Sequence, residues 1–250
     1  MKKLLPYLVL LAAVMAVAST LLPSRQRSDF DVATVGRLPV LVNGRLKPLD
    51  TVARTSLLVL QGRQRVVTPD GRALAPIEWL LDVLCAPAAA DGYRHFLVEN
   101  QEVLDLFGLR PAEGDGGKRF SYAQLAKGLA ELDRQAKLAD EVEAPLRTPF
   151  QNQALKLRNR LVLYQRLKYT MQPPDARGFF ADVTQLDATL PANLAAVRAR
   201  QRGQPHDEAA FRKMAELVQA FDSMATAGYL IAIPPAGANA DLNAWKTPGQ

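Results

Sequence analysis

The chain has 250 residues, enough for one large domain or two small ones with a buried core. Hydrophobic residues make up 48% and charged residues 22% of it, which excludes both a polytopic membrane protein and a wholly disordered chain. The formal net charge is +6, and the single cysteine, Cys85, excludes an intrachain disulfide.

The N-terminal segment predicts export. Residues 4–22 carry no charge and follow two lysines. As a helix, they would extend about 28 Å at about 1.5 Å per residue, which just spans a bilayer core. We therefore expect a single-pass anchor in the inner membrane with the bulk of the chain in the periplasm. The alternative is a signal peptide cut near Ala18, where residues 16–18 form a small-x-small pattern, giving a secreted periplasmic protein.

Three regions follow along the chain. Residues 1–27 form the signal anchor or signal peptide with its flanks, and residues 28–233 form a mainly helical extracytoplasmic domain. Residues 234–250 are rich in proline, glycine and alanine, which predicts an extended tail. No later apolar run approaches the 18 residues of a second membrane span.

Two short hairpins are predicted at the start of the domain. Residues 38–42 and 45–49 flank Asn43-Gly44, whose two central residues both tolerate positive φ, although Pro48 weakens the second arm as a strand. The turn at residues 68–71 lies between two further short apolar segments and predicts a second hairpin.

Helices are predicted through most of the remaining chain. The first should follow Pro48, with Asp50 or Thr51 as its N-cap. Apolar spacing then predicts helices over residues 77–84, 99–107, 121–142, 150–171, 190–202 and 207–229. The fold class is therefore mostly α: a helical periplasmic domain with a small β-hairpin element near its N-terminus, preceded by one transmembrane or signal-anchor helix.

No constellation of catalytic or metal-binding residues is present in the sequence. His95 and His206 are far apart, and there is no Cys-x-x-Cys-His motif for haem attachment. Cys85 lies on the apolar side of a predicted helix, where a buried, inert thiol is expected. We therefore expect an accessory or interaction protein without a catalytic residue, a metal or a bound cofactor.

A basic stretch has two interpretations. Residues 145–174 contain six positive residues and no acidic one, whereas residues 131–143 contain five acids. Antiparallel pairing of the two helices would bring these opposite charges together. Alternatively, the basic residues contact anionic lipid headgroups or an acidic partner. Nucleic acid is disfavoured by the export signal. The candidate basic surface consists of Lys156, Arg158, Arg160, Arg166 and Lys168.

The segment 38–54 is the candidate docking site. One interpretation is purely structural, a hairpin that leads into a capped helix with its charges in solvent. The other is a charged cluster that docks a membrane partner. The candidate docking residues are Asn43, Gly44, Arg45, Lys47, Pro48, Asp50, Thr51 and Arg54.

The same segment carries a family resemblance. The string Leu38-Pro39-Val40, followed by residues 43–54 (Asn-Gly-Arg-Leu-Lys-Pro-Leu-Asp-Thr-Val-Ala-Arg), resembles the extracytoplasmic region of bacterial system II (Ccs-type) cytochrome c biogenesis proteins. Weaker similarities lie at residues 76–82, 119–122 and 233–245. The resemblance implies a periplasmic module that assists haem delivery or apocytochrome handling with a multi-spanning, haem-handling membrane protein. Haem would be reached only through that partner.

The chain also departs from that family. The family's haem-handling core is a multi-spanning membrane domain with a tryptophan-rich segment and membrane histidines, whereas this chain has only Trp79 and Trp245. No haem-contacting residue can therefore be carried over. The alternative function is a generic periplasmic binding or scaffold domain unrelated to haem, with an apolar groove between the helices at 150–171 and 207–229.

Overall fold

The computed structural model describes residues 10–11, 13–15, 30–174, 178–236 and 241–250. The chain divides into two compact units, Met1–Val35 and Gly36–Gln250. A short helix, α2 (Val32–Gly36), lies at the boundary between them, and Asp31 accepts a hydrogen bond of 3.0 Å from the Thr34 N–H in its first turn.

The predicted fold class is wrong in one part, the transmembrane helix. Within the described ranges, no helix is both long enough and apolar enough to cross a membrane. Only residues 10–11 and 13–15 of the apolar segment are described, and both pieces are helical. The remainder of residues 4–22 lies outside the described residues. The other part of the prediction, a mostly α fold with small hairpins, is confirmed.

The first hairpin forms where the sequence predicts it. Strands β1 (Pro39–Val42) and β2 (Arg45–Pro48) pair antiparallel, with φ of 53° at Asn43 and 70° at Gly44. Positive φ at both central residues is typical of a type I′ turn, whose twist matches that of the paired strands. Helix α3 (Leu49–Gln61) follows at once, so its N-cap is Pro48, which makes no side-chain cap. The expected cap by Asp50 or Thr51 is therefore wrong, because both residues already lie inside the helix.

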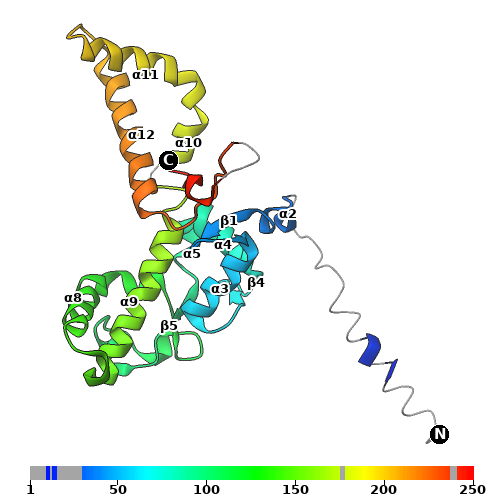
Figure 1. Ribbon diagram of the computed structural model, residues 1–250. Coiled ribbons are helices and arrows are strands. Elements are labelled where there is room, and N and C mark those ends of the chain that lie inside the picture. Colours follow the sequence, from blue (N-terminus) through cyan, green and yellow to red (C-terminus); the bar gives the residue numbers. More distant parts are fainter. Residues whose placement is uncertain (1–9, 12, 16–29, 175–177, 237–240) are drawn as a thin grey trace, which may run out of the picture. The chain divides into compact units, whose positions relative to one another are not determined.

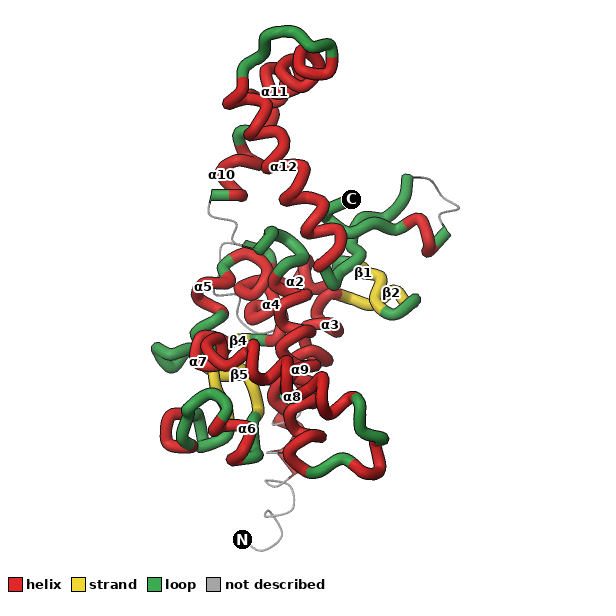
Figure 2. The backbone as a smooth tube through the Cα atoms, turned by 90° about the vertical axis from the view of Figure 1, so that its left-hand side faces the viewer, coloured by secondary structure: helices red, strands yellow, loops and turns green. Residues whose placement is uncertain are grey.

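Two further strand pairs and a series of helices complete the unit (Figures 1 and 2). Strand β3 (Val66–Val67) pairs with β4 (Ala73–Leu74), and β5 (Arg94–Leu97) pairs with β6 (Arg119–Ser121). The α-helices are α4 (Pro76–Cys85), α5 (Pro87–Ala90), α6 (Gln101–Asp105), α7 (Tyr122–Leu125), α8 (Leu129–Asp140), α9 (Pro149–Lys168), α10 (Phe179–Thr184), α11 (Leu186–Gln201) and α12 (Glu208–Ala227). The 3-10 helices of the described residues are Pro111–Glu113, Ala126–Gly128, Ala144–Leu146 and Leu242–Ala244.

The core lies where α3, α4 and α9 pack with β5. Its largest fully buried side chains are Trp79, Tyr164, Phe96 and Phe120. Helix α9 begins at Pro149 after an N-cap in which Thr148 accepts a hydrogen bond from the Gln151 N–H. Four apolar residues at helical spacing, Ala154, Leu157, Leu161 and Tyr164, are buried on one face of this helix. The helix therefore packs along one face over most of its length.

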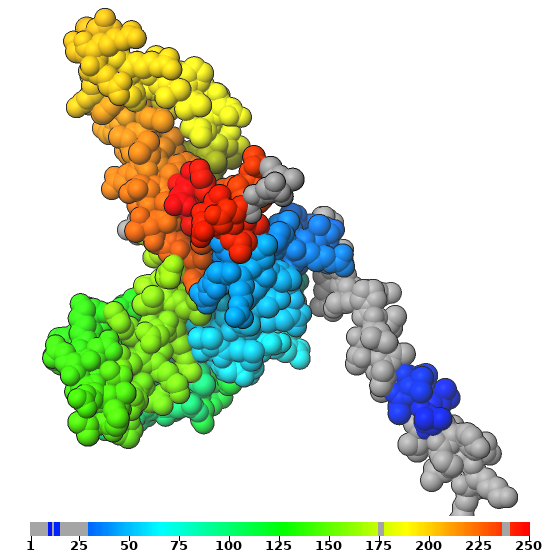
Figure 3. Space-filling view, in the orientation of Figure 1, coloured from blue at the N-terminus to red at the C-terminus, as the bar shows by residue number. Residues whose placement is uncertain are grey.

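The last helices and the C-terminal residues return the chain to the hairpin. Helices α11 and α12 pack on each other, and Phe179 at the start of α10 stacks edge-on against Phe221 with ring centres 5.7 Å apart. After α12, Ile231 pairs with Leu41 of β1, and Ile233 pairs with Lys246. Figure 3 shows these C-terminal residues in red on the surface beside the blue hairpin. The predicted extended tail thus includes an antiparallel bridge and a 3-10 turn.

Candidate functional site

Residues 38–54, hereafter the hairpin–helix unit, are held by buried side chains and by backbone hydrogen bonds. Val40 and Val42 are 1% and 5% exposed. The Leu41 N–H donates to the Ile231 carbonyl at 2.8 Å, and the Leu49 N–H donates to the Leu38 carbonyl at 2.9 Å. The backbone of β1 is thereby fixed to the rest of the domain, and β2 is fixed to β1.

The side chains of β2 face solvent. Arg45 and Pro48 are exposed, Leu46 is 48% exposed, and Lys47 is half-buried. Neither Arg45 nor Lys47 makes an ion pair or a side-chain hydrogen bond within the part of the chain that the structure describes. The strand therefore presents two unpaired positive charges and one leucine on a rigid support.

Asp50 and Arg54 neutralise each other on α3. The Arg54 Nε lies 2.6 Å from the Asp50 Oδ2, one helical turn away. Asp50 is also covered on one side, because a Cβ placed on Gly36 would come within 3.3 Å of the Asp50 Cβ. Thr51 is half-buried and its carbonyl accepts a hydrogen bond from the Thr55 hydroxyl. The unpaired positive charge of the hairpin–helix unit is therefore concentrated on β2 and not on α3.

Four of the five predicted basic-surface residues on α9 contact other parts of the domain. Burial lowers the pKa of one of them, Arg160, below its usual range. The partners are Asp133 for Arg158, the carbonyls of Val59 and Leu97 for Arg160, the carbonyl of Gly228 for Arg166, and Asp91 for Lys168. Lys156 is exposed, and no partner for it is found among the described residues.

The antiparallel pairing of α8 and α9 is confirmed by its charge pairs. Arg158 of α9 lies 3.1 Å from Asp133, and Arg147, just before α9, lies 3.7 Å from Asp140 at the end of α8, so the later of the two basic residues meets the earlier acid. These pairs are partly exposed, so each stabilises the fold by less than about 1 kcal/mol. Contact with lipid headgroups stays a prediction, and Lys156 is the residue of α9 best placed for it.

A polar group lies in the aromatic core. The His95 ring has its centre 4.7 Å from that of Phe96, 5.0 Å from Tyr164 and 5.7 Å from Trp79. Neither ring nitrogen of His95, nor the Trp79 Nε1, has a hydrogen-bond partner among the residues that the structure describes. Burial lowers the pKa of His95 to about 3, so the imidazole is neutral at physiological pH. This histidine is enclosed by the core and is not available to a ligand at the surface.

Asp91, which no sequence pattern predicts as a site residue, ties the loop before β5 to α9. Its two carboxylate oxygens accept a hydrogen bond of 2.8 Å from the Tyr164 hydroxyl and one of 2.7 Å from the Lys168 ammonium. Burial raises the pKa of Tyr164, and the negative charge of Asp91 raises it further. The Lys168 ammonium also lies 5.0 Å from the centre of the Tyr122 ring. Asp91 stands in a short loop with no motif around it, so no sequence signal identifies it.

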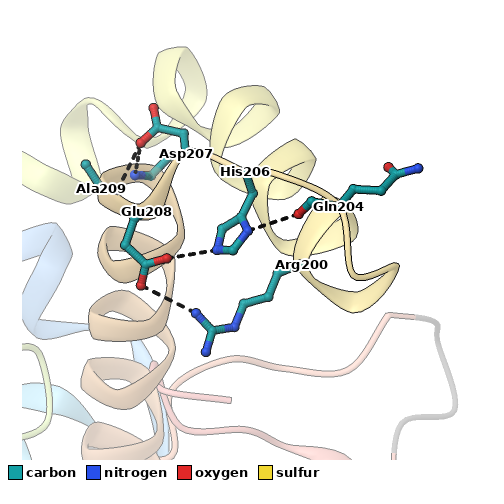
Figure 4. A network of polar contacts seen from close by, with 7 residues as sticks. Arg200, Gln204, His206, Asp207, Glu208 and Ala209 are labelled. Carbon is teal, nitrogen blue, oxygen red and sulfur yellow. Dashed lines mark hydrogen bonds and ion pairs between the residues drawn. The ribbon is translucent and has the colours of Figure 1, made fainter.

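The second histidine lies in the turn between α11 and α12 (Figure 4). The His206 Nε2 is 2.9 Å from a carboxylate oxygen of Glu208, and its Nδ1 is 3.2 Å from the Gln204 carbonyl. Arg200 approaches the other Glu208 oxygen at 3.4 Å, and Asp207 accepts two backbone N–H groups in the first turn of α12. This network joins the two helices. Within the described ranges, there is no cluster of three or more His, Cys, Asp or Glu side chains that could hold a metal ion.

Several concavities in the described surface are large enough for a small ligand, and two of them differ clearly in character. One, of about 430 Å³, is polar and includes Arg63, Arg94 and Asp115, with Arg63 paired to Asp115 at 2.8 Å. The other, of about 600 Å³, is a more apolar groove along α12. Its lining comes from α11, α12 and the C-terminal residues. The apolar groove predicted between α9 and α12 is therefore formed by α12 with α11 instead.

No protein-family model matches the chain, and no curated protein matches it. The resemblance to Ccs-type proteins therefore rests on the sequence itself, above all on residues 38–54.

Proposed function

We propose that this protein is a periplasmic interaction module that assists cytochrome c maturation, in haem delivery or apocytochrome handling, together with a multi-spanning haem-handling membrane protein. One observation carries the proposal: the segment that resembles Ccs-type proteins is also an exposed, charged and rigidly supported unit. Its backbone is bonded at Leu38 and Leu41 to α3 and to the C-terminal residues.

The arrangement suits docking for a physical reason. A surface that is already ordered loses little conformational entropy when a partner binds, so more of the contact energy appears as affinity. The buried Val40 and Val42 supply that order, while the exposed Arg45 and the half-buried Lys47 have no ion pair among the described residues and attract negative charge.

The test uses a strain that lacks the protein. We expect the deletion to lower the amount of covalently haem-loaded c-type cytochromes, measured by haem staining, with the apocytochromes still synthesised. The wild-type chain should restore the haem-loaded cytochromes, whereas the double variant Arg45→Glu/Lys47→Glu should not. The matched control is Arg110→Glu/Lys127→Glu, which makes the same change in net charge at two other exposed residues that have no ion pair among the described residues.

The partner is tested in parallel by co-purification. The wild-type protein and the control variant should co-purify with a haem-containing multi-spanning protein in detergent, and the hairpin variant should not. The proposal is wrong if the deletion leaves c-type cytochromes at normal levels and the protein stays separate from that partner.

A second candidate function is a binding or scaffold domain unrelated to haem. The groove of about 600 Å³ favours it, because apolar side chains of Leu186, Leu190, Met214 and Phe221 line it and the nearby Val218 is 56% exposed. Native mass spectrometry of the purified protein would test this function. A co-purifying apolar molecule that is absent from a Val218→Glu variant would support it, and an empty groove together with lost cytochromes in the deletion strain would exclude it.

A further inference from the structure

The outer edge of β2 presents free backbone groups at one residue. Leu41 directs its N–H away from β2, toward the Ile231 carbonyl at 2.8 Å. Leu46 is the residue directly opposite Leu41 in the hairpin. In an antiparallel pair, two opposite residues either both point their backbone groups at each other or both point them outward. The N–H and the carbonyl of Leu46 therefore point away from β1.

This edge is open, whereas the other edge of the hairpin is occupied. The outer edge of β1 is paired with Ile231. For Leu46, no backbone hydrogen bond from outside the hairpin is found among the residues that the structure describes, and its side chain is 48% exposed. Pro48, two residues further, has no N–H to offer. The Leu46 N–H is thus the single outward donor of β2.

The side chains of β2 alternate between two faces. Leu46 lies on one face, and Arg45 and Lys47 lie on the other. Charges on an edge strand generally discourage pairing with another strand. Here, however, both charges are positive and unpaired, so they discourage a basic or neutral strand and attract an acidic one.

We infer that β2 docks an extended segment of a partner protein, which adds one strand beside β2 and alternates apolar with acidic residues. Its apolar residues pack against Leu46, its acidic residues pair with Arg45 and Lys47, and its backbone bonds the free groups of Leu46. The inference rests on the proposed function for the identity of the partner, but the chemistry of the segment follows from β2 itself.

The first experiment measures binding of a fluorescent nine-residue peptide of alternating valine and glutamate to the full-length protein by fluorescence anisotropy. Leu46→Pro should weaken binding about fivefold, because one backbone hydrogen bond contributes about 1 kcal/mol. Proline at this position leaves the hairpin bonds intact, since the lost N–H points outward. Leu46→Ala, which keeps the N–H, is the matched control and should bind more tightly than Leu46→Pro. Arg45→Glu/Lys47→Glu should abolish binding.

The second experiment separates strand addition from simple charge attraction. Two versions of the peptide carry backbone N-methyl groups, one on its valines and one on its glutamates. Successive residues of a strand point their N–H groups to opposite sides, so only one of the two versions should lose binding. Thermal unfolding of each protein variant, measured alongside, shows that the fold is retained.

The outcomes separate this inference from the proposed function. No binding up to about 1 mM peptide, wild-type binding by Leu46→Pro, or equal binding of both methylated peptides would overturn strand addition. The proposed function fails on a different result, normal c-type cytochromes in the deletion strain. A peptide that binds as described in a protein whose deletion leaves cytochromes unchanged supports the strand and refutes the function.

Discussion

Lowering the pH from 7 to 4 should remove about 3 kcal/mol of unfolding free energy through His95 alone. The residue is fully buried, its nitrogens have no hydrogen-bond partner in the described part of the chain, and burial lowers its pKa to about 3. In the unfolded chain the same group titrates at its ordinary value of 6.5.

The sign follows from which state binds the proton. Between pH 6.5 and pH 3 the unfolded chain binds a proton at His95 and the folded protein does not, so acid favours unfolding. The contribution of His95 to stability is complete above pH 6.5 and is lost progressively as the pH falls toward 3. Each pH unit in this window corresponds to about 1.4 kcal/mol, and pH 4 lies about 2.5 units into it.

The assay is urea denaturation at pH 7 and at pH 4 for the wild type and for His95→Leu. Other acid-sensitive groups, such as the ion-paired Asp133 with its lowered pKa, contribute equally to both proteins and cancel in the difference. At pH 7 the leucine variant should be within about 1.5 kcal/mol of the wild type, because the volumes are similar and no hydrogen bond is lost. At pH 4 it should be the more stable protein. If the unfolding free energy falls equally in both proteins between pH 7 and pH 4, the reasoning is refuted.

Three further predictions concern stability and are measured by urea denaturation at pH 7. Gly44→Ala should destabilise the hairpin by about 1–2 kcal/mol, because Gly44 has φ of 70°. Lys168→Met should lower the free energy of unfolding by about 2–3 kcal/mol, because it leaves the charge of Asp91 unpaired and both side chains are less than a quarter exposed. Its control on the same helix, Lys156→Met, should change stability by less than about 0.5 kcal/mol. Thr148→Ala should cost about 1 kcal/mol through the loss of the α9 cap.

The features that the sequence predicted correctly are local. Asn43-Gly44 specifies its hairpin because the turn and the paired strands lie within ten residues of one another. The apolar spacing of α9 predicts its buried stripe for the same reason. The β5–β6 pair was not predicted, since its strands are short and more than twenty residues apart, and neither carries a hairpin turn. The helix start was misplaced because Pro48, with φ of −59°, already fits the N-cap position.

Charge complementarity allowed part of the candidate site to be predicted, but only between neighbouring helices. Opposite charges on adjacent segments correctly indicated the pairing of Arg158 with Asp133. Arg160 instead bonds the carbonyls of Val59 and Leu97, which lie far away in the sequence and carry no side-chain signal. A basic helix therefore looks like a binding surface until the backbone groups around it are known.

The internal pairing of Asp50 changes what its removal should do. If Asp50 contacted the partner directly, Asp50→Ala would weaken binding. In the structure it neutralises Arg54 at 2.6 Å, so Asp50→Ala leaves Arg54 unpaired and adds one net positive charge to the hairpin–helix unit. The acidic peptide should then bind equally well or up to about threefold more tightly at low salt, an effect that fades as salt screens the charge. Arg54→Ala breaks the same ion pair with the opposite change in charge and should bind more weakly. Weaker binding by Asp50→Ala at an unchanged melting temperature would show that the partner contacts α3, and the assignment of the docking edge to β2 would fall.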